Sequence, residues 1–288
     1  MPISSGKNRL SLGFSPCPND TFIFHALVHG QACAESPDFA AATLADVETL
    51  NEWALAGRLD VTKLSFHALG HVLDRYVLLM AGSALGRGCG PLLVARKNFP
   101  VAALPNLTIA IPGRYTTAAL LLRMYSPVAL ATRVMRFEEI MPAIVAGEVD
   151  AGVIIHESRF TFQAHGLLLL RDLGAWWEQE TGFPIPLGGI AAKRSLGKEK
   201  IQAIDRCIRA SVSAAFASPE AGMPYIRQHA QELDDKIIKD HIGLYVNPFS
   251  VDLGKEGGAA VREFLARGRR LGFFPRQSSD LPLTSLEL

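Results

Sequence analysis

The pattern of apolar and polar positions along the chain predicts an α/β protein. Short apolar runs rich in β-branched residues alternate with longer stretches whose apolar positions recur at helical spacing. Because strands and helices alternate, we expect mainly parallel sheets. Strands are predicted at residues 10–14, 40–44, 60–65, 76–80, 107–111, 133–136, 151–155, 167–170 and 190–192. Helices are predicted at residues 22–28, 46–57, 67–73, 116–124 and 138–146, and over most of the chain from residue 198 onward.

Two interruptions of this alternation predict two lobes, as expected for a chain of 288 residues, which exceeds the usual size of one simple core. A glycine-dense loop feeds an apolar run at 91–95, and a stretch rich in proline and glycine at 184–189 precedes a return strand. We expect a discontinuous first lobe (residues 1–95 plus 190–288) and an inserted second lobe (residues 96–189), joined by two connecting strands. A ligand would then lie between the lobes, which would close on it.

Charge and composition restrict the class of partner. The formal net charge is +1 and the basic residues are dispersed, which argues against nucleic acid and anionic membranes as partners. The apolar runs are far shorter than the roughly 20 residues that span a bilayer. The four cysteines form no CxxC pair and the amino terminus has no apolar core of the secretory type, so we expect reduced thiols and a cytoplasmic location. The sequence does not predict the oligomeric state.

One strand ends in the strongest candidate for chemistry. The run Asp150-Ala-Gly-Val-Ile-Ile-His156 is a buried strand that delivers one histidine to its carboxyl end, where ligand crevices lie in open α/β sheets. Histidine has an ordinary pKa near 6.5, which suits proton transfer near neutrality. His156 is therefore the candidate catalytic base. The alternative is a structural histidine that bonds a loop carbonyl.

Two further segments are candidates for substrate binding. Thr116 and Thr117 stand where a turn enters a helix, and hydroxyls and free N–H groups there can hold an anionic group. The alternative is ordinary capping of the helix by one threonine. The segment Thr62-Lys63-Leu64-Ser65 ends a strand of the first lobe and would face the threonines across the cleft. The alternative is that Ser65 merely caps the next helix.

The segment between the first strand and the first helix has two readings. In Ser15-Pro-Cys-Pro-Asn-Asp20, Asn19 or Asp20 is expected to cap the helix. Cys17 is a possible nucleophile, but no base is fixed beside it in sequence, which favours a buried, inert thiol.

The chain carries no motif for a metal or an organic cofactor. Two histidine pairs, His67 with His71 and His25 with His29, have helical spacing, but neither has the glutamate of an HExxH motif or an obvious third ligand. The glycines around residues 86–90 match neither a dinucleotide-binding fingerprint nor a phosphate loop. We therefore expect no metal and no cofactor.

Several motifs in order resemble one family, the 1,4-dihydroxy-6-naphthoate synthases, which are lyases of the futalosine route to menaquinone. The matching segments are Ser15-Pro-Cys-Pro-Asn-Asp-Thr-Phe-Ile-Phe24, Asp46-Val-Glu-Thr-Leu-Asn51, Thr62-Lys-Leu-Ser65, Gly113-Arg-Tyr-Thr-Thr117, Ile155-His-Glu-Ser-Arg-Phe-Thr161, Trp176-Trp-Glu178 and Pro184-Ile-Pro-Leu-Gly-Gly189. The likeness runs from about Leu10 to at least Asp252.

The resemblance implies a two-lobed fold like that of type 2 periplasmic binding proteins. It implies cleavage of cyclic dehypoxanthinylfutalosine to 1,4-dihydroxy-6-naphthoate and dihydroxyacetone without a metal or organic cofactor. It places the proton acceptor on His156 and substrate contacts on Thr62–Ser65 and Thr116–Thr117. Glu157 receives no role.

Two other classes remain open. A solute-binding protein without chemistry would have the same fold but should carry an export signal. A sister enzyme similar to chorismate dehydratase is the second alternative. The Ser-Pro-Cys-Pro-Asn-Asp-Thr and His-Glu-Ser-Arg motifs favour the naphthoate synthases.

Overall fold

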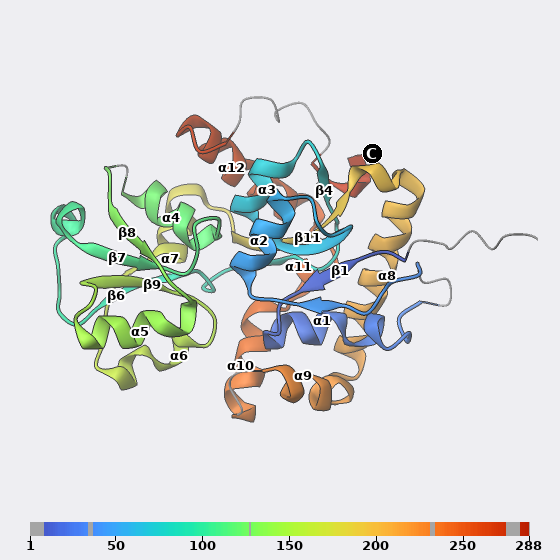
Figure 1. The fold of residues 1–288 in the computed structure, drawn as a ribbon, viewed down its shortest axis with the longest axis horizontal. Helices are drawn as coiled ribbons and strands as arrows, with labels where there is room; N and C mark the ends of the chain where they lie inside the picture. The colour runs from blue at the N-terminus through green and yellow to red at the C-terminus, as the bar shows by residue number, and fades with distance from the viewer. Residues whose placement is uncertain (1–8, 34–36, 127, 231–233, 275–282, 288) are drawn as a thin grey trace, which may run out of the picture.

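The computed structural model describes residues 9–33, 37–126, 128–230, 234–274 and 283–287. Apart from Arg9, the amino-terminal segment that was considered for an export signal lies outside these residues. The described chain forms two sheets, each packed against helices, and the two sheets lie side by side in Figure 1. The α/β class and the two lobes predicted from the sequence are confirmed.

The first sheet has the strand order β2-β1-β3-β11-β4, with β5 paired to β11. Its strands are β1 (Leu12–Phe14), β2 (Thr43–Leu44), β3 (Val61–Ser65), β4 (Tyr76–Leu78), β5 (Ala84–Gly86) and β11 (Ile185–Lys193). The helices of this part are α1 (Pro18–Val28), α2 (Val47–Leu55), α3 (Phe66–Val72), α8 (Lys198–Ala217), α9 (Met223–His229), α10 (Asp235–Tyr245), α11 (Pro248–Val251) and α12 (Gly254–Arg270).

The second sheet has the order β10-β6-β9-β7-β8. Its strands are β6 (Leu92–Ala95), β7 (Thr108–Ile111), β8 (Ala131–Val134), β9 (Ala151–Ile154) and β10 (Leu168–Asp172). Its helices are α4 (Thr117–Tyr125), α5 (Phe137–Ala146), α6 (Ser158–Thr161) and α7 (Leu173–Thr181). They form the green and yellow-green half of Figure 1. Short 3₁₀ segments complete the two parts at Val101–Asn106, Phe162–His165, Arg194–Leu196, Pro219–Gly222 and Ser285–Glu287.

The prediction of mainly parallel sheets is wrong at the two connecting strands. β11 runs antiparallel to β3, β4 and β5, and β6 runs antiparallel to β9 and β10. The start of β11 pairs with the end of β3, at Gly188 and Ser65, and the start of β6 pairs with the end of β9, at Leu92 and Ile154. Each connecting strand enters its sheet from the cleft, where the carboxyl ends of the other strands lie, so it must run against them.

The strand pairings of β6 and β11 also indicate where the chain passes from one lobe to the other. β6 belongs to the second sheet, although its residues fall before the expected boundary at 95, and β11 belongs to the first sheet from Ile185 onward. The crossovers therefore lie between β5 and β6 and between α7 and β11. The predicted lobe boundaries, 1–95 plus 190–288 and 96–189, stay predictions. Lobes divided according to these strand pairings would have boundaries a few residues away.

The crossover regions are held together by close backbone approach. A Cβ on Gly90 would lie 2.3 Å from the Cα of Gly174, at the start of α7. Only glycine permits this contact. The glycine-dense loop between β5 and β6 therefore allows close packing of the backbone against α7.

One apolar core continues across both sheets. It joins α3 and α12 of the first part to α4 and α7 of the second, and separate cores lie under α1 and α8 and under α5. Trp177 of α7 is buried in the shared core, where its indole N–H donates to the Pro184 carbonyl at 3.1 Å and its ring packs against Phe264 of α12. The lobes thus meet over a packed, apolar surface on one side of the cleft.

Candidate functional site

His156 lies just beyond the carboxyl end of β9, as its sequence position predicted. It is the one non-glycine residue with a positive φ, 58°, among the described parts of the chain. Residues with such angles cluster at functional sites because the surrounding structure must enforce them. Arg159, three positions later, donates to the carbonyl oxygens of Gly88 and Gly90 and pairs with Asp172 at 3.0 Å. These contacts tie the turn that carries His156 to the crossover.

Two adjoining cavities meet at His156. The inner cavity is the larger of the two. It is lined by Ser15, Asn19, Asp20, Val47, Lys63, Leu64, Ser65, Ala84, Cys89, Pro91, Thr116, Thr117, Ala118, Ile155, His156, Leu187, Gly188 and Tyr245. The outer cavity is lined by Pro16, Cys17, Pro18, Asp46, Val47, Phe137, His156, Glu157, Ile237, Ile238 and His241. Both parts of the molecule contribute to each cavity.

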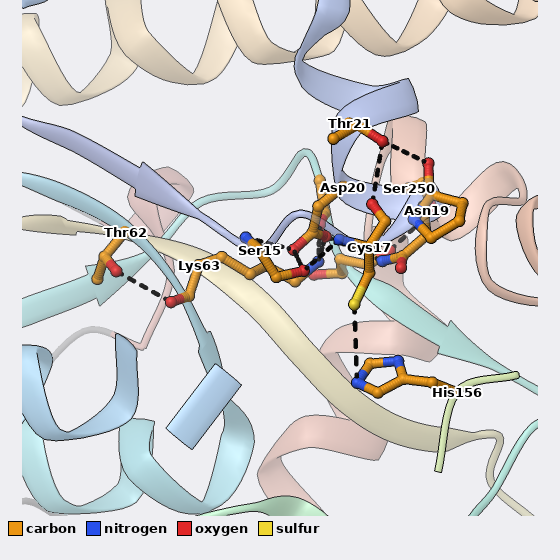
Figure 2. Close-up of polar contacts among 12 residues, drawn as sticks. Ser15, Cys17, Asn19, Asp20, Thr21, Thr62, Lys63, His156 and Ser250 are labelled. Atoms are coloured by element: carbon orange, nitrogen blue, oxygen red, sulfur yellow. Dashed lines mark hydrogen bonds and ion pairs between the residues drawn. The ribbon is translucent and has the colours of Figure 1, made fainter. Parts of the chain in front are cut away.

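The surroundings of His156 favour its neutral form. Its Nε2 lies 4.0 Å from the Cys17 Sγ (Figure 2), and its ring packs edge-on against Phe137 at 5.1 Å. Burial lowers the pKa of His156 below its usual 6.5, and the negative charges of Glu157 and Asp20 partly oppose that shift. A neutral imidazole can accept a proton, so the geometry is compatible with a general base.

The surroundings of Cys17 do not favour the thiolate form that a nucleophile needs. Burial raises the pKa of its thiol well above the ordinary range, and the Ser15 hydroxyl and the Lys63 charge oppose that shift only in part. Its Sγ lies 4.0 Å from the His156 Nε2. A thiol held in its protonated form is a poor nucleophile. The structure therefore favours the inert reading of this cysteine.

A buried ion pair borders the inner cavity. The Lys63 Nζ lies 2.9 Å from the Asp20 Oδ1, and both side chains are almost fully buried. Asp20 Oδ2 accepts from the backbone N–H and the hydroxyl of Ser15, and Oδ1 accepts from the Asn19 side chain (Figure 2). Lys63 also donates to the Gly82 carbonyl at 3.3 Å. Such a pair is stable only because each charge finds several partners.

The expected cap of the first helix is wrong. α1 begins at Pro18, with Cys17 at the N-cap position and no side-chain cap. Proline suits the first helical position because its missing N–H would have no partner there anyway. Asn19 and Asp20 are therefore free to line the cavity. The proline after Cys17 was the signal in the sequence that could have revealed this.

The segment Thr62–Ser65 is divided by the structure. Lys63, Leu64 and Ser65 line the inner cavity, whereas Thr62 lies deeper in β3 and donates its hydroxyl to the Lys63 carbonyl at 2.9 Å (Figure 2). Ser65 holds the N-cap position of α3 without capping it, because its backbone N–H and its hydroxyl both bond the Asn51 amide. Contact of Thr62 with a substrate is not favoured by this position.

The two threonines at α4 have different partners. The Thr116 hydroxyl accepts from the Ala119 N–H at 3.2 Å and so caps the helix. The Thr117 hydroxyl donates to the Leu187 carbonyl of β11 at 2.6 Å, a bond that joins the two parts of the molecule. The capping alternative therefore accounts for Thr116. Both residues also line the inner cavity.

A second bond across the cleft lies next to these threonines. The Glu48 carboxylate of α2 accepts from the Tyr115 backbone N–H at 2.9 Å, just before α4. A Cβ on Gly113, where φ is 154°, would lie 2.4 Å from the same carboxylate. The turn Gly113–Tyr115 thus fits around a side chain of the opposite lobe. Together with Thr117, this contact holds the cleft closed in this structure.

The different partners of the threonines predict different effects of their removal. We expect Thr116→Val to lower the free energy of unfolding by about 1 kcal/mol, as loss of a cap does, with little change in KM. We expect Thr117→Val to raise KM severalfold with a smaller effect on unfolding, because it weakens the closed cleft. Thermal unfolding and steady-state kinetics of both variants measure this. Equal effects of the two substitutions on KM would contradict the assignment of Thr116 to helix capping and of Thr117 to cleft closure.

The histidine pairs have aromatic and structural roles. His67 Nδ1 lies 3.1 Å from the Thr116 carbonyl oxygen, and burial lowers the pKa of His67 to about 3. The rings of His25 and His29 pack against each other and against Tyr225 in tilted or edge-on contacts. No group of three or more metal-ligating side chains occurs within the described ranges. The expectation of no metal stays a prediction.

The fold and the site together define a two-lobed protein of the periplasmic-binding-protein-like class, with a cavity between its lobes. A protein of Archaeoglobus fulgidus has a similar structure, with a TM-score of 0.87 and 31% identity over 93% of this chain and 100% of its own. The periplasmic aliphatic sulphonate binding protein of Escherichia coli has a TM-score of 0.63 at 13% identity, covering 94% of this chain and 90% of that chain. At that identity the likeness shows the fold alone.

Sequence comparison narrows the class to one family. A family model described as menaquinone biosynthesis matches residues 10–270. A relative from Thermus thermophilus named 1,4-dihydroxy-6-naphthoate synthase is 54% identical over 91% of this chain and 95% of its own. A relative of the same name from Streptomyces coelicolor is 47% identical over 94% of this chain and 96% of its own. The chain belongs to this menaquinone biosynthesis family, and the resemblance found in its motifs is confirmed.

No helix among the described residues is long and apolar enough to cross a membrane.

Proposed function

We propose that this protein is a lyase that converts cyclic dehypoxanthinylfutalosine to 1,4-dihydroxy-6-naphthoate and dihydroxyacetone, with His156 as the general base. The identity to two enzymes named as 1,4-dihydroxy-6-naphthoate synthases supports the reaction. The observation that carries the role of His156 is its position where the two cavities meet, at a strained φ and in a buried setting that lowers its pKa.

The shape of the site supports a division of the substrate between the cavities. The inner cavity combines apolar walls with the Ser65 and Thr117 hydroxyls and the Lys63 ammonium, which suits an aromatic ring system with polar substituents. We place the three-carbon fragment in the outer cavity, which is the smaller of the two. The bonds that break would lie between them, beside His156. Removal of a proton there can drive elimination, and formation of the aromatic product supplies driving force.

The protein's own contribution is then position and proton transfer. Holding the substrate in a closed cleft aligns the reacting carbon with His156 and excludes water. General base catalysis contributes roughly 10²–10⁴-fold. The reaction as proposed conserves all atoms between substrate and products, so it calls for no redox cofactor.

The decisive experiment is incubation of the purified protein with cyclic dehypoxanthinylfutalosine, followed by mass spectrometry for the naphthoate and for dihydroxyacetone. Both products should appear in equal amounts. Binding without conversion would instead favour a solute-binding protein of the same fold. Conversion of chorismate instead of this substrate would favour the sister enzyme.

The absence of a metal requirement is a separate prediction. We expect activity to survive dialysis against a chelator, because the described part of the chain gathers no set of metal ligands at the cavity. Loss of activity that returns when zinc or magnesium is added would contradict this. A cytoplasmic location and the restriction of partners to a small-molecule substrate also stay predictions.

A further inference from the structure

A second histidine lies beside His156, and no step proposed so far uses it. His241 of α10 is 1% exposed, and its ring stacks almost parallel to that of His156 with 5.8 Å between centroids. Its Nε2 lies 2.9 Å from the Asn19 Oδ1. Its Nδ1 has no hydrogen-bond partner within the described ranges and lies 3.7 Å from the Glu157 Oε2. His241 and Glu157 both line the outer cavity.

The polar chain behind His241 fixes which ring nitrogen carries a proton. Asp20 is paired with Lys63, so its carboxylate can only accept hydrogen bonds. The Asn19 group that faces Asp20 at 2.9 Å must therefore be its NH₂. Asn19 then presents its oxygen to His241, so the Nε2 of His241 must be the donor. In the neutral ring this leaves Nδ1 as an acceptor.

The Nδ1 of His241 and the Glu157 carboxylate consequently face each other as two acceptors. Two lone pairs at 3.7 Å in a partly buried site repel unless a proton lies on one of the groups or a donor bridges them. The side chain of Glu157 is 18% exposed, so a proton on it can pass to a molecule in the outer cavity. The arrangement therefore favours a single proton held jointly by the two groups.

The parallel rings couple this proton to the charge state of His156. Burial, and then the positive charge that His156 carries when protonated, lower the pKa of His241 well below 6.5. A proton taken up by His156 thus weakens the hold of the neighbouring pair on its own proton. Other ionisable groups facing these rings are Lys63 of β3, Asp20 and Cys17 at α1, Asp46 before α2, Glu138 of α5 and Tyr245 of α10.

We propose that Glu157 and His241 together are the proton donor of this site and protonate the departing three-carbon fragment in the outer cavity. The inference rests on the proposed lyase function and adds the acid that complements the base. Glu157 touches the fragment and is the catalytic residue. His241 acts through Glu157 and is a positioning residue.

The proton transfers balance. His156 takes a proton from carbon, and the electrons of that C–H bond form the new double bond of the ring system. The bond to the three-carbon fragment breaks, its electron pair stays with the fragment, and the fragment receives the proton of the Glu157–His241 pair. The excess proton on His156 returns to the pair through solvent after the products leave. No oxidant, reductant or other co-reactant is consumed.

Two variants test the proposal. Glu157→Gln keeps the size of the side chain but has no acidic proton. His241→Gln retains a side-chain donor for Asn19, but its amide oxygen cannot hold a proton as Nδ1 can. We expect each to lower kcat by about 10²–10³-fold, with KM within about threefold of normal. The double variant should be no slower than the slower single one, because the two residues hold one proton between them.

Controls separate a proton-holding role from a structural one. Glu199→Gln removes an exposed carboxylate of α8 far from the cavities and should leave kcat and the pH profile unchanged. Thermal unfolding reports whether a variant folds, and the partly exposed Glu157 provides the test even if His241→Gln unfolds. Normal kcat in folded Glu157→Gln, or additive losses in the double variant, would overturn this inference but would leave the proposed lyase function standing. A wild-type protein that does not convert the substrate would overturn the proposed function itself.

Discussion

His156→Ala should lower kcat by about 10²–10⁴-fold while the Kd for the substrate changes only a few-fold. The reason is that the inner cavity and its polar lining remain, whereas the group that takes the proton is lost. The pH profile of the wild-type enzyme supplies the complementary result. Burial lowers the pKa of His156, so the base stays neutral at pH 6.5, and kcat should fall on the acid side only below that value. Steady-state kinetics and ligand titration measure both.

Because His156 has a positive φ, a second variant is needed to separate loss of the base from a change in the backbone. Alanine tolerates a φ of 58° less well than asparagine does, so His156→Ala can lose activity through a displaced turn. His156→Asn tolerates the same φ but supplies no base. We expect both variants to be equally slow, with His29→Gln on the exposed end of α1 as a control of normal activity. Near-normal turnover by His156→Asn would contradict the role of His156 as base and would assign it a conformational one.

The parts of the fold that were predicted from sequence are those with a local signal. The apolar run before His156 and the closing Gly147 of α5 gave elements within a few residues of those observed. β5 was missed because its three residues lie in a glycine-dense loop and pair only with β11, which is distant in sequence. α7 was missed although Asp172 caps it at the Ala175 N–H, a signal that the sequence contained. The antiparallel connecting strands follow from the cleft geometry, which no local pattern encodes.

The candidate site was predictable where a strand or helix end brings a residue to the cleft. That logic identified His156, Ser65 and Thr117, and all three line the inner cavity. It could not identify His241, whose partner Asn19 is 222 residues away in the chain. It also placed Thr62 at the site, because spacing alone does not tell which residue of a strand reaches the edge. Pairings between distant elements need the tertiary structure.

Lys63→Met should destabilise the protein more than any surface substitution. It leaves the carboxylate of Asp20, 2% exposed, without its cation, and breaking a buried pair in this way costs about 3–5 kcal/mol. Lys236→Met is the matched control, because it removes the same charge from a surface pair with Asp240 whose lysine is 83% exposed. Such pairs contribute at most about 1 kcal/mol. Urea unfolding followed by circular dichroism compares the two variants.

A double variant checks that the uncompensated charge of Asp20 is the cause of the instability of Lys63→Met. Asp20→Asn added to Lys63→Met removes the uncompensated charge, so the double variant should recover part of the lost free energy of unfolding. Activity should not recover with it. An amide in place of the Asp20 carboxylate can donate as well as accept, so it no longer forces Asn19 to turn its NH₂ toward that side chain. The chain that fixes the proton on His241 Nε2 is then broken. If Lys63→Met cost no more than Lys236→Met, the buried pair would contribute little to stability, and Lys63 would be left with the role of a substrate contact alone.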